Sequence, residues 1–318
     1  MSVSYLKYLH RVSQFIRAKP IRPTLEYSIG HKDRRLGICE YGVSKECARH
    51  TLLYFHGTPA CRLEPCLHSD AELENIYHTL GVRLICIERP GFGVSSPVKE
   101  LYRVDDFAAE VLSLESELYL PRRFSVLGFS AGAPYVWALK AKASHRVEAA
   151  IVVAGVVSPT ITNSKFFLRK SMERVFFALP KSMQTLFFQG GIGLIKIELK
   201  ILSLMFQVLQ RLGAVSFDHA KLEAIISMLD ESSRQGYDGV TFDTLRNQDS
   251  PWGFDLTKAI DDRVYLYYSM QDWTVPPSEA RLLEKHTGLT IRWIDGGHLC
   301  LYFNLKEILE SSILRNSQ

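Results

Sequence analysis

The strongest constraint on the fold is an alternation of short apolar segments with segments of helical length. Eight stretches have the composition of strands: 24–29, 35–41, 51–55, 82–88, 123–129, 147–155, 263–269 and 289–294. The middle ones are almost continuously apolar, which is typical of parallel strands covered on both faces. Segments of helical length separate them near 64–80, 103–120, 130–143, 277–287 and 299–315. This order predicts an α/β fold with a mostly parallel eight-stranded sheet and flanking helices.

Two parts of the chain depart from this regular pattern. The strand candidates 24–29 and 35–41 are joined by the turn sequence GHKDR, so we expect an antiparallel hairpin at one edge of the sheet. Between 160 and 250 the alternation stops: the pattern is helical at first and rich in turn residues from 230 onward. We therefore expect a core of residues 21–159 and 251–318, interrupted by a helical insertion of residues 160–250.

The formal net charge of +4 is unevenly distributed. Residues 1–20 repeat apolar side chains at helical spacing, with basic residues between them and no acidic one. This pattern fits a membrane-surface helix, a mitochondrial presequence or a helix docked on its own domain. Residues 160–215 hold eight basic and two acidic residues. Residues 1–20 and the insertion are thus the candidates for peripheral membrane contact, whereas the uniform basic field of a nucleic-acid binder is missing.

Cysteine usage and hydropathy indicate the compartment. The six cysteines, at 39, 47, 61, 66, 86 and 300, have no metal-ligand spacing and follow no secretory signal. We expect reduced thiols in an intracellular protein, cytoplasmic or, as alternatives, mitochondrial or peripherally membrane-bound. The apolar runs are shorter than the roughly 20 residues that a membrane-spanning helix needs.

The stretch RFSVLGFSAGAPYVW, residues 123–137, places a serine between two glycines where a strand candidate meets a helix candidate. A nucleophilic serine must stand clear of the backbone, and a sharp strand-to-helix turn achieves this in a strained conformation. The residues two positions before and after it must then be small. Gly128 and Gly132 meet this requirement, so Ser130 is the candidate nucleophile.

With this turn the chain resembles the α/β-hydrolase superfamily from residue 24 onward. The resemblance implies an acid and then a histidine later in the chain, each in a loop after a late strand. Asp272, just past the seventh strand candidate, and His298, after the eighth, stand at the matching positions. Asp295 is a rival acid, but it lies only three residues before His298 and is too close in sequence to reach behind the imidazole.

The segment LLYFHGTPACRLEP, after the third strand candidate, resembles the oxyanion loop of the superfamily, His-Gly-x-Pro. A tetrahedral intermediate needs preorganised N–H donors for its negative oxygen. The backbone N–H of Ala131, next to the nucleophile, is one expected donor. Because Pro59 has no N–H, the other is that of Thr58. We expect Gly57 to shape this loop and His56 to order it without titrating in catalysis.

Two further segments fit the resemblance. The stretch ICIERPGFGVSSP, residues 85–97, resembles a recurrent loop of the superfamily, with Glu88 where aspartate is commoner. We assign Arg89 to shaping this loop, with no catalytic role.

The insertion at residues 160–250 stands where the superfamily has its cap. Its large apolar residues either line an acyl pocket or pack among the helices of the cap: Phe166, Phe167, Phe176, Phe177, Leu186, Phe187, Phe188, Met205 and Phe206.

Together these features predict a serine hydrolase that cleaves a carboxylic ester of a small, apolar acyl substrate. Ser130, His298 and Asp272 form the triad, and the chemistry requires neither cofactor nor metal.

Peptidases, thioesterases, carbon–carbon hydrolases and acyltransferases share this triad and remain alternatives. A serine at the turn argues against epoxide hydrolases and dehalogenases, which need a carboxylate there. Outside catalysis, the alternative is a hydrolase-like ligand receptor or membrane-associated protein. The sequence leaves the oligomeric state open.

Overall fold

The computed structural model describes residues 20–30, 34–68, 71–97, 102–162, 178–211, 220–249 and 252–314. The helix expected over residues 1–20 lies outside these ranges except for its last residue. The side chains of Phe166, Phe167, Phe176, Phe177 and Phe206 are also outside the described part of the chain.

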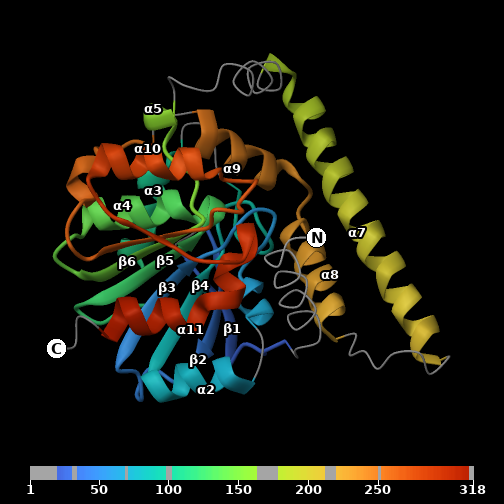
Figure 1. Cartoon of the computed structure of the whole chain (residues 1–318), viewed down its shortest axis with the longest axis horizontal. Helices are drawn as coiled ribbons and strands as arrows, with labels where there is room; N and C mark the ends of the chain where they lie inside the picture. The colour runs from blue at the N-terminus through green and yellow to red at the C-terminus, as the bar shows by residue number, and fades with distance from the viewer. Residues whose placement is uncertain are drawn as a thin grey trace.

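Eight strands form one sheet in the order β1-β2-β4-β3-β5-β6-β7-β8 (Figure 1). Their bounds are β1 (Leu25–Ile29), β2 (Leu36–Gly42), β3 (His50–Phe55), β4 (Val82–Ile87), β5 (Phe124–Phe129), β6 (Val147–Val153), β7 (Val264–Tyr268) and β8 (Ile291–Trp293). β2 pairs antiparallel with both β1 and β4, and β3 to β8 pair in parallel. The predicted eight-stranded, mostly parallel sheet and its antiparallel edge hairpin are confirmed.

Helices cover both faces of the sheet, as Figure 1 shows. On one face lie α2 (Ala71–Leu80) and α11 (Cys300–Ile313); on the other lie α3 (Val104–Ser113), α4 (Ala133–Lys142) and α10 (Pro277–Thr287). Short 3-10 helices are η1 (Glu64–Leu67), η2 (Ser130–Gly132), η3 (Leu256–Ala259) and η4 (Gly297–Leu299). Along β3, Leu52 and Tyr54 face the first layer of helices, while Leu53 and Phe55 face the second. Burial on both sides explains why the strand reads as a continuous apolar run.

Among the described residues, the α-helices between β6 and β7 are α5 (Pro159–Thr162), α7 (Lys181–Arg211), α8 (Ala220–Ser232) and α9 (Asp238–Asp249). In Figure 1, α7 stands apart from the sheet, and α8 lies beside it on the side of the core. None of the helices within the described ranges combines the length and the apolarity that crossing a bilayer requires.

The expectation of a turn-rich stretch from 230 onward holds at residues 233–237 but is wrong for residues 238–249, which form α9. This helix has few apolar residues, so its hydropathy gives little helical signal. Its inward side is nevertheless buried, through Val240, Thr241 and the carboxylate of Asp243. Tertiary contacts therefore stabilise a helix that the periodicity of the sequence does not reveal.

Candidate active site

Ser130 lies at the sharp turn between β5 and α4, in the first position of η2. Its φ of 51° is in the left-handed region, a conformation that costs a non-glycine residue about 1–3 kcal/mol. A Cβ on Gly128 would lie 2.6 Å from the carbonyl oxygen of Gly132, and a Cβ on Gly132 would lie 2.0 Å from that of Phe55. Both positions therefore require glycine, for the steric reason inferred from the sequence.

The three side chains expected to form a triad meet at the carboxyl ends of parallel strands. Ser130 follows β5, Asp272 follows β7, and His298 follows β8 in η4. Ser130 Oγ lies 3.0 Å from Nε2 of His298, and Nδ1 of His298 lies 2.9 Å from Oδ2 of Asp272. Because these strands run parallel, their ends lie at one edge of the sheet, and three distant parts of the chain meet there.

The contacts of Asp272 define the roles of the imidazole nitrogens. Its carboxylate is buried, and Oδ1 accepts the backbone N–H groups of Thr274 at 2.8 Å and Val275 at 2.9 Å. A carboxylate beside Nδ1 favours the tautomer in which Nδ1 carries the proton. Nε2 of His298 is then left with a lone pair that accepts from the hydroxyl of Ser130. Asp295, the rival acid, instead accepts through its backbone carbonyl from Asn304 Nδ2 at 2.7 Å.

Next to this edge, the loop after β3 carries His56, Gly57 and Thr58. The N–H of Gly57 donates to Glu64 Oε2 at 2.9 Å, and the same carboxylate accepts the hydroxyl groups of Tyr54 at 2.7 Å and Tyr302 at 2.9 Å. Burial raises the pKa of Glu64, while these hydrogen bonds oppose the rise. Glu64 thus anchors the loop, a role that nothing in its local sequence indicated.

His56 is fully buried in this loop. Its Nε2 accepts the backbone N–H of Arg89 at 3.0 Å, and Nδ1 lies 2.9 Å from the carbonyl oxygen of Gly57. Burial, followed by the nearby guanidinium of Arg89, holds the pKa of His56 well below its ordinary value. A neutral imidazole with both nitrogens engaged orders the loop, in agreement with the sequence interpretation.

Arg89 connects the two segments that carry the expected oxyanion donors. Its Nη2 donates to the carbonyl oxygen of Gly57 and to Thr58 Oγ1, both at 2.8 Å, and its Nη1 donates to the carbonyl oxygen of Ala131 at 3.2 Å. The guanidinium also forms an ion pair with Asp243 of α9. The assignment of Arg89 to the loop after β4 alone was therefore incomplete.

The shape of that loop depends instead on the preceding residue. The carboxylate of Glu88 accepts the backbone N–H groups of Val94 at 2.7 Å and Ser95 at 3.1 Å, and it forms a 2.7 Å ion pair with Arg62. A Cβ on Gly93 would lie 2.1 Å from Oε1 of Glu88. The loop is thus wrapped around a buried carboxylate, which leaves the Arg89 side chain directed at Gly57, Thr58 and Ala131.

The apolar side chains of the insertion differ in their surroundings. Phe187 and Met205 of α7 are 66% and 47% exposed, whereas Leu186 lines a cavity of about 640 Å³ between α7 and α9. Phe188 packs inward against a small cluster that joins α7, α9 and the loop after β4. The expectation of inward packing or pocket lining is therefore wrong for Phe187 and Met205, which lie on the solvent side of α7.

A family model described as the alpha/beta hydrolase fold matches residues 50–192. Together with the sheet described above, this match shows that the chain has the α/β-hydrolase fold. The matched range contains the loop after β3 and the turn at Ser130, while Asp272 and His298 lie beyond it. No curated protein matches the chain.

Solved structures of two esterases and a thioesterase domain share the fold. A thermophilic esterase from Thermogutta terrifontis has a TM-score of 0.58 at 18% identity, with 93% of this chain and 100% of that chain covered. An esterase from Exiguobacterium antarcticum has a TM-score of 0.57 at 14% identity, with coverages of 92% and 100%. The thioesterase domain from the curacin biosynthetic pathway has a TM-score of 0.56 at 15% identity, with coverages of 92% and 99%. At these identities the likeness establishes the fold.

Proposed function

We propose that this protein is a serine hydrolase that cleaves a carboxylic ester, or a related acyl bond, of a small apolar substrate. The observation that carries the proposal is the hydrogen-bond chain from Ser130 Oγ to Nε2 of His298 and from Nδ1 to Asp272, with distances of 3.0 Å and 2.9 Å. A pure ligand receptor has no need of this arrangement at a strained turn. The esterases and the thioesterase among the structural neighbours support the same chemistry.

In the proposed first half-reaction, Ser130 Oγ attacks the acyl carbonyl carbon. His298 Nε2 accepts the hydroxyl proton as the new C–O bond forms, and it then donates this proton to the leaving alcohol. Asp272 keeps Nδ1 protonated and stabilises the transient imidazolium. The backbone N–H groups of its neighbouring residues hold the carboxylate in place, so the geometry is set before substrate arrives.

The proposed oxyanion donors are the backbone N–H groups of Thr58 and Ala131. The close approach of Gly132 to the carbonyl oxygen of Phe55 brings the turn after β5 against the end of β3. Arg89 hydrogen-bonds to both segments and fixes one relative to the other. In the second half-reaction, His298 accepts a proton from water as the water oxygen attacks the acyl carbon. His298 then returns this proton to Ser130 Oγ as the C–Oγ bond breaks and the acid is released.

A fluorophosphonate probe tests this proposal directly. We expect the wild-type protein to be labelled and Ser130→Ala to remain unlabelled, with equal circular dichroism spectra. Hydrolysis of p-nitrophenyl esters graded by acyl length, beside matched thioesters and amides, then identifies the preferred bond and chain length. A folded wild-type protein that neither reacts with the probe nor hydrolyses any of these compounds would refute catalysis and favour the ligand-receptor alternative.

A further inference from the structure

The longest helix of the insertion has its polar and apolar faces reversed. α7 has 31 residues, and its inward side contains the buried residues Gln184, Ile192 and Ser203. A surface helix normally presents polar side chains to solvent on the opposite side. On α7 that side carries nine large apolar side chains, each 44–66% exposed: Met183, Leu186, Phe187, Leu194, Ile195, Ile197, Ile201, Leu204 and Met205.

All of these except Ile195 fall on one line along the helix, which we call the α7 stripe. Each of them lies three, four or seven residues from another member of the set, so their side chains share one face. From Met183 to Met205 the stripe is about 33 Å long at 1.5 Å per residue. Gly190, also exposed, falls on the same line and leaves its centre free of polar side chains. This is a continuous, straight apolar surface in contact with solvent.

The charges of α7 are predominantly positive. The helix contains Lys181, Lys196, Lys200 and Arg211 against a single acidic residue, Glu198. Lys196 lies on the inward side, where it forms a 2.8 Å ion pair with Asp230 of α8. Lys200 and Glu198 are exposed, and by helical spacing they border opposite sides of the α7 stripe. The charges at the two borders of the stripe therefore cancel, and the positive excess is that of residues 160–215 as a whole, with eight basic and two acidic residues. An apolar face on a segment with such an excess is typical of helices that lie in an anionic lipid interface.

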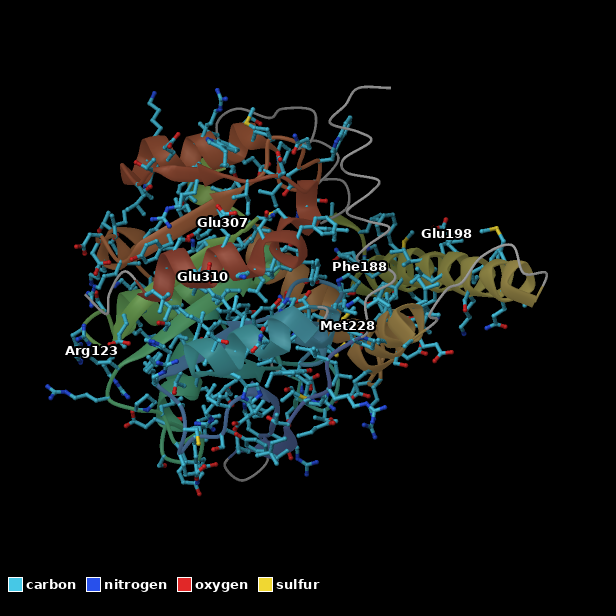
Figure 2. The ribbon with its side chains drawn as sticks, turned by 60° about the horizontal axis from the view of Figure 1, so that its bottom comes forward. Arg123, Phe188, Glu198, Met228, Glu307 and Glu310 are labelled. Atoms are coloured by element: carbon cyan, nitrogen blue, oxygen red, sulfur yellow. The ribbon has the colours of Figure 1, made fainter. Side chains whose placement is uncertain are left out.

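The position of α7 suits contact with a flat surface. Figure 2 shows the helix extending away from the sheet, with Phe188 labelled toward the body of the molecule and Glu198 farther along the helix. α8 and α9 pack against α7 from the side of the core. The whole length of the stripe can therefore meet a plane without any rearrangement of the sheet.

We propose that α7 binds the surface of an anionic lipid bilayer, with the α7 stripe buried among the acyl chains and Lys200 at the headgroups. A second copy of this chain is a less suitable partner, because residues 160–215 hold eight basic and two acidic residues, so two copies would bring like net charges together. Anionic headgroups neutralise that charge. The proposal is independent of catalysis, since the α7 stripe is exposed on the side of α7 opposite its buried residues Gln184, Ile192 and Ser203.

Co-flotation of the full chain with vesicles tests the proposal. The vesicles are phosphatidylcholine with 30% phosphatidylglycerol, or phosphatidylcholine alone. The stripe variant is Leu194→Glu/Ile197→Glu/Ile201→Glu. The matched control, Ser44→Glu/Ser116→Glu/Thr290→Glu, makes the same change in charge at exposed sites elsewhere. A third protein lacks residues 1–19. Thermal melts verify folding, and light scattering gives the mass of each protein.

We expect wild type, the matched control and the truncated protein to float with the anionic vesicles. Binding should weaken with added salt and with removal of the anionic lipid, and the stripe variant should bind at least about tenfold less. The proposal is overturned if wild type floats with neither vesicle, or if the stripe variant binds like wild type. It is also overturned if only the truncation removes binding, or if wild type is a dimer that the stripe variant separates without any vesicle binding.

Discussion

Arg89 and Asp243 form an ion pair in which both side chains are completely buried, although 154 residues separate them in the chain. Asp243 Oδ1 also accepts the hydroxyl of Tyr135 at 2.5 Å, so the pair joins α9 to α4 as well as to the loop after β4. Nη2 and Nη1 of Arg89 donate to the backbone carbonyls of Gly57 and Ala131, respectively. One guanidinium thus holds the insertion and both proposed oxyanion segments together.

Substitutions in the Arg89–Asp243 pair should affect stability and catalysis separately. Asp243→Leu leaves a buried guanidinium without its counterion and should lower the free energy of unfolding by about 3–5 kcal/mol. The double variant Arg89→Met/Asp243→Leu should recover most of that loss, because no charge remains buried. Its kcat should nevertheless fall about tenfold to a hundredfold with KM little changed, since the oxyanion segments lose their connection. Urea unfolding and steady-state kinetics measure the two effects.

The control for this prediction is a second buried pair far from the site. Arg83, at the start of β4, forms a bidentate ion pair with Glu40 of β2. We expect Arg83→Met/Glu40→Leu to change stability without changing kcat. If the Arg89→Met/Asp243→Leu protein kept full kcat, the pair would be a purely structural contact.

The acid of the proposed triad can be identified by comparing two carboxamide variants. Asp272→Asn should reduce kcat by about four orders of magnitude, because an amide beside Nδ1 favours the wrong tautomer of His298. The fold should persist, since the amide oxygen can still accept the N–H groups of Thr274 and Val275. Asp295→Asn should leave kcat within about twofold, because within the described ranges the hydrogen bond of Asp295 is made by its backbone carbonyl and not by its carboxylate. The reverse ranking in an ester-hydrolysis assay would assign the acid to Asp295.

The sheet could be predicted from the sequence because burial on both faces makes each central strand a continuous apolar run. The turn at Ser130 could be predicted because its steric requirement is local: Gly128 and Gly132 lie within two residues of the serine. The role of Arg89 could not, because its partner Asp243 lies on a helix that hydropathy did not reveal. A pairing across 154 residues leaves no spacing in the sequence to recognise.

The orientation of α7 illustrates a different limit. Its apolar periodicity is visible in the sequence, and such a stripe normally faces a core. In the structure the inward side is instead occupied by smaller or polar residues such as Gln184 and Ser203, together with Ile192. Periodicity defines which residues share a face, but not which neighbour that face meets.

Two glycine substitutions should separate close packing from helix propensity. A Cβ on Gly132 would meet the backbone carbonyl oxygen of Phe55 at 2.0 Å. Since neither backbone segment can rotate away, Gly132→Ala should lower the free energy of unfolding by about 1–3 kcal/mol and abolish most activity.

Gly190→Ala in α7 is the matched control, because apart from the neighbouring backbone of α7 itself no atom lies within 4 Å of the added methyl group. It should be stabilising by about 0.5–1 kcal/mol, with unchanged activity. Thermal melts and ester hydrolysis provide both measurements, and an active, stable Gly132→Ala protein would contradict the proposed packing.

Acid sensitivity should arise in part from a buried histidine outside the proposed site. His68 is fully buried between the rings of Tyr54 and Tyr302, and within the described chain its Nε2 has no hydrogen-bond partner. Burial, followed by the charge of Lys221, lowers its pKa to about 3. The unfolded chain, with an ordinary histidine pKa near 6.5, therefore binds a proton at His68 between about pH 6.5 and pH 3, whereas the folded protein does not.

The free energy of unfolding should accordingly fall as the pH decreases through this window, and His68 alone should contribute about 1.4 kcal/mol per pH unit. His56, whose pKa is also lowered, should act in the same direction. His68→Phe keeps an aromatic ring between the two tyrosines and removes the titrating group. We expect the free energy of unfolding of this variant to depend less steeply on pH between 6.5 and 4, by about 1.4 kcal/mol per unit. Above pH 7 the two proteins should have the same pH slope, which provides the internal control. Urea titrations across the pH range measure the difference, and parallel curves below pH 6.5 would show that His68 becomes protonated in the folded state.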